Sequence, residues 1–338
     1  MGKPWMTWLG RILGYVFLGL LIVLAVAITF TIGWRPFIGA KSRPLTSRKF
    51  EPTPQRLARG QYLADAVLAC FGCHSVFDDK SDPPAITSKK GIGSVFLDKG
   101  KFRIVSPNIT PDPTAGVGNW SDDALARAIR EGLSRDGSAL FPLMGYPHFR
   151  NLSEEDLASV VVYIRSLEPV HNSLPKTSLP FWLQRVVLGE PQPIWSPVPE
   201  PDLSSAVKRG EYLVRIAGCA DCHTPEKGMP PHPVPDLAFG GGSGFGEVAS
   251  ANITPDPSGI SYYDEALFIE AMRTGRVKAR SLKLPMPWPI YKNMTDDDLK
   301  AVFAYLRTLK PVHHLVDNTE LPTQCKICGE KHGLGDHN

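Results

Sequence analysis

The chain has 338 residues, enough for two domains and additional segments. Its composition, 43% hydrophobic and 21% charged, is typical of a globular protein, while 32 prolines and 30 glycines predict long loops. The 37 basic residues nearly balance the 34 acidic ones, so the charge gives no indication of a nucleic-acid partner. All six cysteines fall in Cys-x-x-Cys pairs, a pattern that implies no disulfide framework.

The first predicted element is a membrane-spanning helix within residues 1–50. Residues 12–32 carry no charge, and as a helix they would span about 31 Å, the thickness of a bilayer core. Trp5, Trp8 and Trp34 stand at its edges, as interfacial aromatic residues do. A cleaved signal peptide would have a shorter apolar core and a small-residue cleavage site, whereas Gly-Trp-Arg-Pro follows here. We therefore predict an uncleaved membrane anchor.

Two copies of Cys-x-x-Cys-His follow the anchor. This spacing is the attachment site of c-type haem, in which two thioether bonds hold the porphyrin and the adjacent histidine ligates the iron. The alternative is a redox or zinc Cys-x-x-Cys pair that histidine follows by chance, and two copies in matching contexts argue against it. The candidate attachment residues are Cys70, Cys73 and His74 in the first copy and Cys219, Cys222 and His223 in the second.

The haem motifs also set the expected orientation of the anchor. More basic residues follow the apolar run than precede it, so the positive-inside rule alone would place the large domain in the cytoplasm. Covalent haem attachment, however, takes place on the outer face of the membrane, and long domains cross largely regardless of flanking charge. We expect a single-pass protein of the bacterial inner membrane with its haem domains on the periplasmic face.

The chain after residue 50 contains an internal repeat. Arg-Gly-Gln-Tyr-Leu at 59–63 matches Arg-Gly-Glu-Tyr-Leu at 209–213, and Asn-Ile-Thr-Pro-Asp-Pro occurs at 108–113 and again at 252–257. A repeat of this length indicates duplicated domains rather than a solenoid. The predicted segments are a first domain over 51–170, a proline-rich linker over 171–206, a second domain over 207–316 and a tail over 317–338.

Each repeat is predicted to consist of short helices in long loops, so the expected fold is mostly α. An amphipathic segment at about 55–69 runs into the first haem motif, and Ser121 is predicted to cap a helix that ends near residue 133. Capping boxes that begin at Ser153 and Thr295 each precede an apolar helical stripe. No convincing alternating strand is present.

Two further segments have an uncertain role in the sequence alone. The linker holds one apolar patch, residues 181–188, which we expect to pack in the groove between the domains, with contact to a membrane partner as the alternative. The glycine run at 240–244 follows no predicted strand and lacks the Lys-Ser/Thr of a phosphate loop, so we interpret it as a flexible turn.

A haem iron bound by one histidine has a sixth position, and a methionine sulfur there raises the reduction potential and suits electron transfer. Met144 is the only methionine between the first haem motif and the linker, and it lies in a proline-containing loop. Met286 occupies the matching place in the second repeat. We predict these two residues as the sixth ligands. The weaker candidates are Met229, Met272 and Met294, while His148 is the rival of Met144 or else a surface group.

From about residue 55 to 315 the chain resembles the membrane-bound cytochrome c subunits of bacterial alcohol, sorbitol and gluconate dehydrogenases. The haem motifs, Asn-Ile-Thr-Pro-Asp-Pro and the methionine loops carry the resemblance. It implies two tandem class I cytochrome c-like domains and two covalently bound haem c groups. The implied ligands are Cys70, Cys73, His74 and Met144 for the first haem, and Cys219, Cys222, His223 and Met286 for the second. It also implies that the helices around Gly60 and Tyr163 cross, as do those around Gly210 and Tyr305.

Two features depart from that family. Its members usually carry three haem sites and often have a carboxy-terminal anchor, whereas this chain has two haem motifs and an amino-terminal anchor. Cys325 and Cys328 form a third pair, but Gly329 follows where a haem site needs histidine. We expect a disulfide or free thiols in a disordered tail, and the alternative is a metal site that includes His332 or His337.

These observations predict a membrane-anchored dihaem cytochrome c that is not itself an enzyme. It would relay electrons from a dehydrogenase to quinone, another cytochrome or an oxidase, with the protein setting the position and potential of the cofactor. One alternative is a dihaem enzyme such as a peroxidase, which needs an iron with an open sixth position. The methionine loops in both repeats argue against it. The other alternative is an integral cytochrome subunit of a respiratory oxidase.

Overall fold

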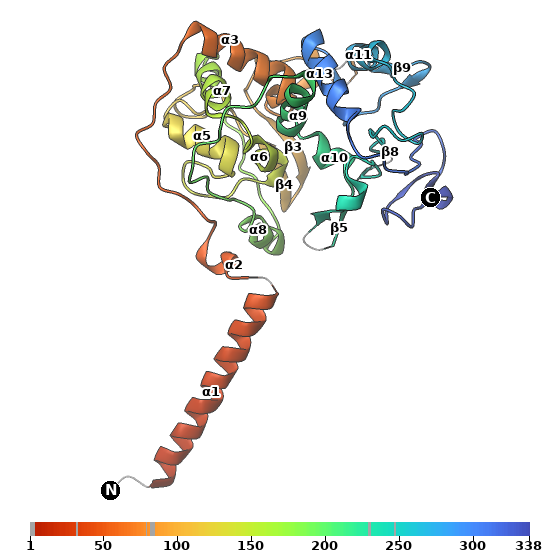
Figure 1. The fold of residues 1–338 in the computed structure, drawn as a ribbon. Helices are drawn as coiled ribbons and strands as arrows, with labels where there is room; N and C mark the ends of the chain where they lie inside the picture. The colour runs from red at the N-terminus through yellow and green to blue at the C-terminus, as the bar shows by residue number, and fades with distance from the viewer. Residues whose placement is uncertain (1–3, 32, 79, 82–84, 229–230, 247) are drawn as a thin grey trace.

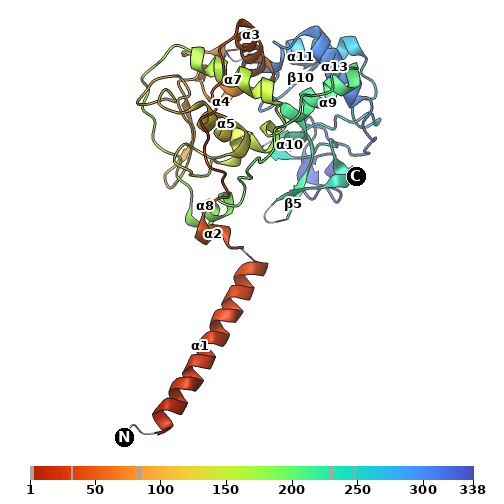
Figure 2. The ribbon, with the colours of Figure 1, turned by 60° about the vertical axis from the view of Figure 1, so that its left-hand side comes forward.

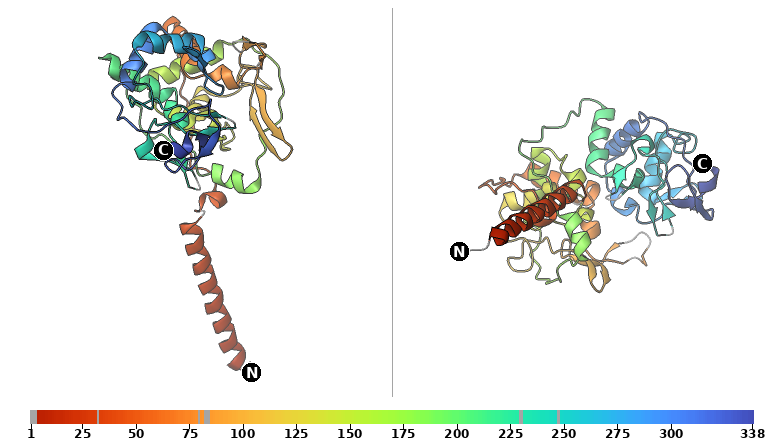
Figure 3. Two further views of the ribbon diagram at one scale, coloured as in Figure 1. Left: turned by 90° about the vertical axis from the view of Figure 1, so that its right-hand side faces the viewer. Right: turned by 90° about the horizontal axis from the view of Figure 1, so that it is seen from below.

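The computed structural model describes residues 4–31, 33–78, 80–81, 85–228, 231–246 and 248–338. A long amino-terminal helix projects from a body in which two halves lie side by side (Figures 1 and 2). We call residues 51–170 the first repeat and residues 207–316 the second repeat. Seen from below, the first repeat and the linker surround the end of the projecting helix, and the second repeat lies to one side (Figure 3).

The projecting helix is α1 (Pro4–Phe30). Its segment Trp8–Phe30 is 23 residues long with a mean hydropathy of 2.7, which makes it long and apolar enough to cross a membrane. It begins earlier than the predicted segment, and Ile32, the predicted last residue, lies outside the described residues. A signal sequence near the amino terminus meets the same criteria of length and composition. A short helix, α2 (Arg35–Ile38), follows it.

The described part of the body is mostly helical, as predicted. The first repeat contains α3 (Pro54–Tyr62), the π-helical turn η1 (Leu63–Val67), α4 (Cys70–Cys73), α5 (Asp122–Glu131), the 3-10 turn η2 (Pro142–Met144), α6 (Tyr146–Phe149) and α7 (Glu154–Ser166). The second contains α9 (Ala206–Ile216), α10 (Cys219–His223), the 3-10 turn η3 (Pro235–Leu237), α11 (Glu265–Thr274), α12 (Trp288–Tyr291) and α13 (Asp296–Leu306). The predicted caps are present, because the side chains of Ser121, Ser153 and Thr295 each accept a hydrogen bond from the backbone N–H three residues further on.

Two pairs of crossing helices, α3 with α7 and α9 with α13, form the frame of the body. A Cβ atom at Gly60 would lie only 1.9 Å from the carbonyl oxygen of Ser159 in α7. A Cβ atom at Gly210 would lie equally close to the carbonyl oxygen of Ala301 in α13. Only glycine permits this approach of two backbones. The expected crossings around Gly60 and Gly210 are therefore confirmed.

The structure also contains short antiparallel hairpins that the sequence pattern does not predict. The longest pairs β3 (Ser94–Lys99) with β4 (Phe102–Ser106), with a register shift between Val95 and Leu97. Its side chains are mostly exposed or half-buried, so no alternation of apolar and polar residues marks it in the sequence. The other strands are β1 (Phe77–Asp78), β2 (Ala85–Ile86), β5 (Glu226–Lys227), β6 (His232–Pro233), β7 (Gly244–Phe245), β8 (Val248–Ala249), β9 (Arg276–Val277), β10 (Arg280–Ser281), β11 (Pro322–Gln324) and β12 (Lys331–Gly333).

The apolar patch of the linker does not lie where we expected. It forms α8 (Phe181–Val187), which lies against α2 near the base of α1 rather than between the repeats (Figure 1). Phe181 is 70% exposed and Trp182 is 60% exposed, while Val187 is buried. The linker is held there because Ser178 and Arg103 form an antiparallel bridge that attaches it to β4.

The tail is ordered, which corrects the expectation of a disordered segment. Strands β11 and β12 form a hairpin that the 3-10 turn η4 (Gly335–His337) follows. The two thiols of the third cysteine pair are buried at its tip and are not joined to each other. The ordering has a physical cause, because the tail packs on Leu237 and Val312 of the second repeat.

One apolar core runs through both repeats. The largest cluster of buried side chains includes Leu63, Val67, Leu125, Val160 and Leu157 from the first repeat and Leu213, Ile216, Phe268, Leu299 and Leu306 from the second. Burial of apolar surface is the main favourable term in folding, so the two repeats stabilise each other.

The helix crossing yields a first prediction. Replacing Gly210 with Ala places a methyl group against the backbone of α13, and we expect a loss of about 1–3 kcal/mol of stability or more, because packed helices cannot move apart freely. The matched control is Gly244→Ala, where the nearest atom to the new methyl group is 3.9 Å away. Thermal unfolding of the detergent-solubilised protein measures the difference. Equal melting temperatures for the two variants would contradict the crossing geometry.

Candidate functional site

The two Cys-x-x-Cys-His motifs adopt the same local structure. Each lies on a short helical turn, α4 or α10, which follows α3 and η1 in the first repeat and α9 in the second. A residue in the left-handed conformation reverses the chain before each turn: Ala69 with φ 52° and Gly218 with φ 69°. The backbone N–H of His74 then donates to the carbonyl of Cys70 at 3.0 Å, which brings the histidine back next to the first cysteine. All four motif cysteines are free thiols.

The motif histidines are buried and have matching partners. Nδ1 of His74 lies 2.7 Å from the carbonyl oxygen of Pro107, and Nδ1 of His223 lies 2.7 Å from that of Ala251. Because a carbonyl oxygen only accepts hydrogen bonds, Nδ1 carries the proton and Nε2 is left as the metal-binding atom. Burial lowers the pKa of both imidazoles, which favours the neutral form that a metal ligand requires.

The repeated Asn-Ile-Thr motif explains how these carbonyls are positioned. Nδ2 of Asn108, the residue after Pro107, donates to the carbonyl of Val170 at 2.7 Å. In the second repeat Nδ2 of Asn252 donates to the carbonyl of Val312, also at 2.7 Å. The carbonyl group that accepts the histidine's hydrogen bond is therefore fixed through the neighbouring asparagine. The asparagine binds the segment that follows the last helix of the repeat. This role of the asparagine was not predicted from the sequence, although the recurrence of the motif in the same order in both repeats was a signal for it.

The two predicted methionines lie at equivalent points of the fold. Met144 ends η2, and Met286 precedes α12; both side chains are half-buried. The ring two residues after each methionine packs on the glycine that ends the preceding long helix. A Cβ atom at Gly132 would meet Tyr146 at 2.6 Å, and one at Gly275 would meet Trp288 at 2.3 Å. The two loops are therefore anchored in the same way.

The rival candidates have other surroundings. Nδ1 of His148 lies 2.6 Å from Oδ2 of Asp221, so this ring reaches across to the haem motif of the other repeat. Met294 is buried in the core and Met272 packs against that core. Met229 lies outside the described residues.

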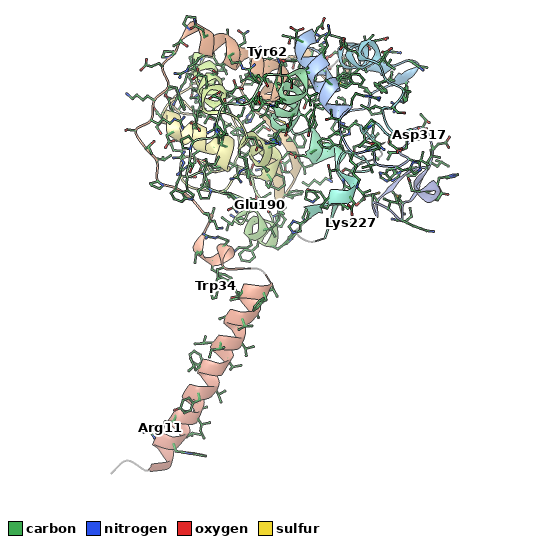
Figure 4. The ribbon with its side chains drawn as sticks, in the orientation of Figure 1. Arg11, Trp34, Tyr62, Glu190, Lys227 and Asp317 are labelled. Carbon is green, nitrogen blue, oxygen red and sulfur yellow. The ribbon has the colours of Figure 1, made fainter. Side chains whose placement is uncertain are left out.

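Reciprocal tyrosine contacts link the repeats at the start of their last helices. The Tyr212 hydroxyl donates to Oδ2 of Asp156 at 2.7 Å and accepts the backbone N–H of Ser153 at 3.2 Å. In the opposite direction, the Tyr62 hydroxyl (Figure 4) donates to Asp298 and accepts the N–H of Thr295 at 3.1 Å. We call these two contacts the tyrosine bridges.

The tyrosine bridges are charge-assisted. Each acceptor carboxylate is also paired with an arginine of its own repeat, Arg59 with Asp156 at 2.8 Å and Arg209 with Asp298 at 2.5 Å. Burial, with the hydrogen bond to the carboxylate, raises the pKa of Tyr62 to about 12, so the hydroxyl keeps the proton that it donates. The bridges therefore hold the two motif-bearing halves in a fixed relation.

Comparison with known proteins agrees with this geometry. The model of the cytochrome c family matches residues 57–168 and 207–310. The cytochrome c subunit of alcohol dehydrogenase (quinone) from Gluconacetobacter polyoxogenes is 30% identical over 274 residues, which cover 75% of this chain and 56% of the relative. The fructose dehydrogenase cytochrome subunit of Gluconobacter japonicus is 32% identical over 281 residues, which cover 77% of this chain and 54% of the relative.

A third relative is closer to this chain in length. It is the diheme cytochrome c-type protein of Cereibacter sphaeroides, 28% identical over 250 residues that cover 72% of this chain and 82% of the relative. The first two relatives are longer, and this chain spans about half of their length. The match of the family model to both repeats shows that the chain belongs to the cytochrome c family.

Proposed function

We propose that this chain is a membrane-anchored dihaem cytochrome c that takes electrons from a dehydrogenase and passes them to quinone, another cytochrome or an oxidase. The observation that carries the proposal is the pair of buried motif histidines. Each has Nδ1 bound to a carbonyl, and Nε2 has no hydrogen-bond partner among the described residues. When bound, haem supplies the one-electron chemistry of its iron. The remaining task of the chain is to hold, orient and enclose it.

The donor set fits two haem c groups. In each repeat two free thiols and a neutral imidazole are carried by one short turn. The proposed ligands are Cys70, Cys73, His74 and Met144 in the first repeat and Cys219, Cys222, His223 and Met286 in the second. Both methionine loops rest in the same way on the end of a long helix, which supports the same axial pair at both sites.

This equivalence favours an electron carrier over a catalyst. A dihaem peroxidase needs one iron with an open or displaceable sixth position, whereas the two repeats here offer the same histidine and the same methionine loop. The relatives point in the same direction, since two of them are named as cytochrome subunits of alcohol and fructose dehydrogenases. A dehydrogenase is therefore the proposed electron donor.

The architecture that we propose has two tandem class I cytochrome c-like domains, residues 51–170 and 207–316, joined by the linker 171–206. Helix α1 would anchor them to the bacterial inner membrane, with the domains on the periplasmic face where haem is attached. The length and hydropathy of Trp8–Phe30 support the anchor. The side of the membrane is inferred from the haem motifs.

The haem groups are expected to be covalent and two in number, because two Cys-x-x-Cys-His turns are present. Extraction of the denatured protein with acidic acetone should leave the colour with the protein, and iron analysis should give two atoms per chain. Colour in the solvent, or one iron per chain, would refute the dihaem assignment.

The haem is also expected to complete the fold of its repeat, because each repeat consists of short helices and long loops around which a large apolar group would fill the core. Replacing Cys70 and Cys73 with Ala should make the first repeat sensitive to limited proteolysis, with the earliest cuts between residues 51 and 170. The double variant at Cys219 and Cys222 is the matched control, and it should move the earliest cuts to the second repeat. Resistance of the first repeat without its haem would show that the group is peripheral.

The ligand assignment predicts separate effects on the two redox steps. Methionine sulfur favours reduced iron, so Met144→Ala should lower one potential by about 0.1–0.3 V, part of the ~0.8 V range that axial ligands span. It should also open that iron to carbon monoxide while the other step stays nearly in place. Met286→Ala should act on the other haem. A redox titration of both variants measures the shifts.

Two further variants test this assignment. Met272→Leu replaces a half-buried methionine that packs against the core, and it should change neither potential. His148→Ala removes the rival ligand and should also leave both steps in place. If His148→Ala produces the shift, or if the reduced wild-type protein already binds carbon monoxide, the histidine–methionine assignment is wrong.

A further inference from the structure

Four metal-ligating side chains meet beneath the carboxy-terminal hairpin. They are His314, Cys325, Cys328 and His332, which we call the Cys2His2 cluster. Each offers one ligand atom, and these four atoms lie within 4.8 Å of one another. The side chains are almost completely buried, with exposed fractions of 0–1%. The cluster is separate from both haem motifs, and the family model ends before it, at residue 310.

The spacing of the cluster fits a single tetrahedral ion. Nε2 of His314 lies 3.4 Å from Sγ of Cys325, and Nε2 of His332 lies 3.4 Å from Sγ of Cys328. Zinc bonds of about 2.3 Å to sulfur and 2.0–2.1 Å to nitrogen, at tetrahedral angles, separate such atoms by about 3.5 Å. Ligands on the two irons of a Rieske-type centre would stand further apart, so the spacing fits one ion rather than a two-iron centre.

Both imidazoles are oriented for metal binding through Nε2. Nδ1 of His314 lies 2.9 Å from the carbonyl oxygen of Gly240, and Nδ1 of His332 lies 3.0 Å from that of Gly333. The carbonyls fix the proton on Nδ1, so each Nε2 faces a cysteine sulfur with its lone pair. Without an ion, these two lone pairs would be buried with only weak thiol donors as partners.

The cysteine pair sits in a turn that presents its sulfurs inward. Gly329 adopts φ 83° after the second cysteine, and its N–H donates to the carbonyl of Cys325 at 3.1 Å. The N–H of Glu330 points at Sγ of Cys328 at 3.4 Å and holds this sulfur in place. Lys227 from β5, which Figure 4 labels, fixes the turn from outside, since its Nζ donates to the carbonyl of Ile327 at 2.8 Å.

Two simpler interpretations of the cluster are weaker. A redox-active Cys-x-x-Cys pair needs an accessible thiol, whereas both cysteine residues are only 1% exposed. An ordinary apolar core is also insufficient, because the buried apolar residues around the two cysteines are only Leu237 and Val312 among the described residues. With so few apolar partners, a metal cross-link would add substantially to the stability of this small hairpin.

We propose that the Cys2His2 cluster holds one structural zinc ion. Binding releases the two thiol protons, and the two thiolates then neutralise the charge of Zn²⁺. Two sulfur and two nitrogen ligands in a tetrahedral arrangement are typical of structural zinc, and four protein ligands leave no open position for catalysis. His332 was one of the two histidines considered from the sequence, whereas His337 is 66% exposed and is not part of the cluster.

The ion would connect the tail to the second haem motif. His314 bonds to Gly240, and the N–H of the next residue, Gly241, donates to the carbonyl of His223 at 2.8 Å. The glycine run at 240–244, interpreted from the sequence as a flexible turn, is thus held between the cluster and a haem ligand. A Cβ atom at Gly242 would lie 2.5 Å from Cε1 of His314, so the chain needs glycine to pass this close.

Metal analysis of the full-length protein tests the proposal. The protein is purified without an affinity step that uses metal, and zinc and iron are measured together. We expect about one zinc per chain, and X-ray absorption at the zinc edge should show two sulfur and two nitrogen neighbours at about 2.3 and 2.0–2.1 Å. This measurement uses the wild-type protein, so it does not depend on whether any variant folds.

Variants assign the ion to the cluster. Replacing Cys325 and Cys328 with Ser should remove the zinc and leave iron unchanged, while His337→Ala, a nearby histidine outside the cluster, should keep both. Wild-type protein without zinc after incubation with zinc sulfate and a thiol reductant would overturn the proposal. So would a Cys325–Cys328 disulfide found by peptide mass in the protein as isolated, or zinc retained by the double serine variant. These outcomes depend on zinc alone, so they neither support nor contradict the haem assignment, which the iron analysis and the redox titration test.

Discussion

The contact between a glycine and the backbone of a second helix determines how each repeat is built. At Gly60 the helix that leads to the first Cys-x-x-Cys-His turn meets α7, and α7 leads to Val170, whose carbonyl holds Asn108. Asn108 in turn follows Pro107, the acceptor for His74. The crossing therefore positions the cysteines through the helix that leads into them. It orients the histidine through α7 and the segment that follows α7. The second repeat follows the same route from Gly210 to His223.

Much of this arrangement could be predicted from local sequence. Helix caps at Ser121, Ser153 and Thr295 depend on residues three positions apart, and the motif spacing depends on one turn, so both are visible in a single chain. The internal repeat also indicated which distant residues correspond to each other. Motifs that occur in the same order in both repeats mark equivalent positions in the two domains. The helix crossings followed from that repeat together with the resemblance to a known family.

The remaining features depend on contacts between distant segments. The β3–β4 hairpin exposes much of both faces and leaves no periodic signal. The fourth member of the Cys2His2 cluster, His314, lies in the segment after α13 and not in the tail that holds the cysteines. The spacing of residues within the tail therefore does not indicate it. The position of α8 depends on the bridge between Ser178 and Arg103, which lie far apart in sequence.

The tyrosine bridges relate the two halves of the molecule by a two-fold pattern. The Tyr62 hydroxyl binds the start of the last helix of the second repeat, and the Tyr212 hydroxyl binds the start of the last helix of the first. The pattern is isologous, because each half contributes the same tyrosine and the same helix end. These are the contacts of a two-fold symmetric dimer, here contained in one chain. Because both halves belong to one chain, these contacts form within the molecule at a high effective concentration. The side chains beside the two haem motifs differ: His148, four residues after Met144, lies over Gly218 before the second motif, whereas Ile290, four residues after Met286, lies over Gly72 inside the first motif. The two halves thus contact each other reciprocally both at their helix ends and beside their haem motifs, with the same side chains at the first place and different ones at the second.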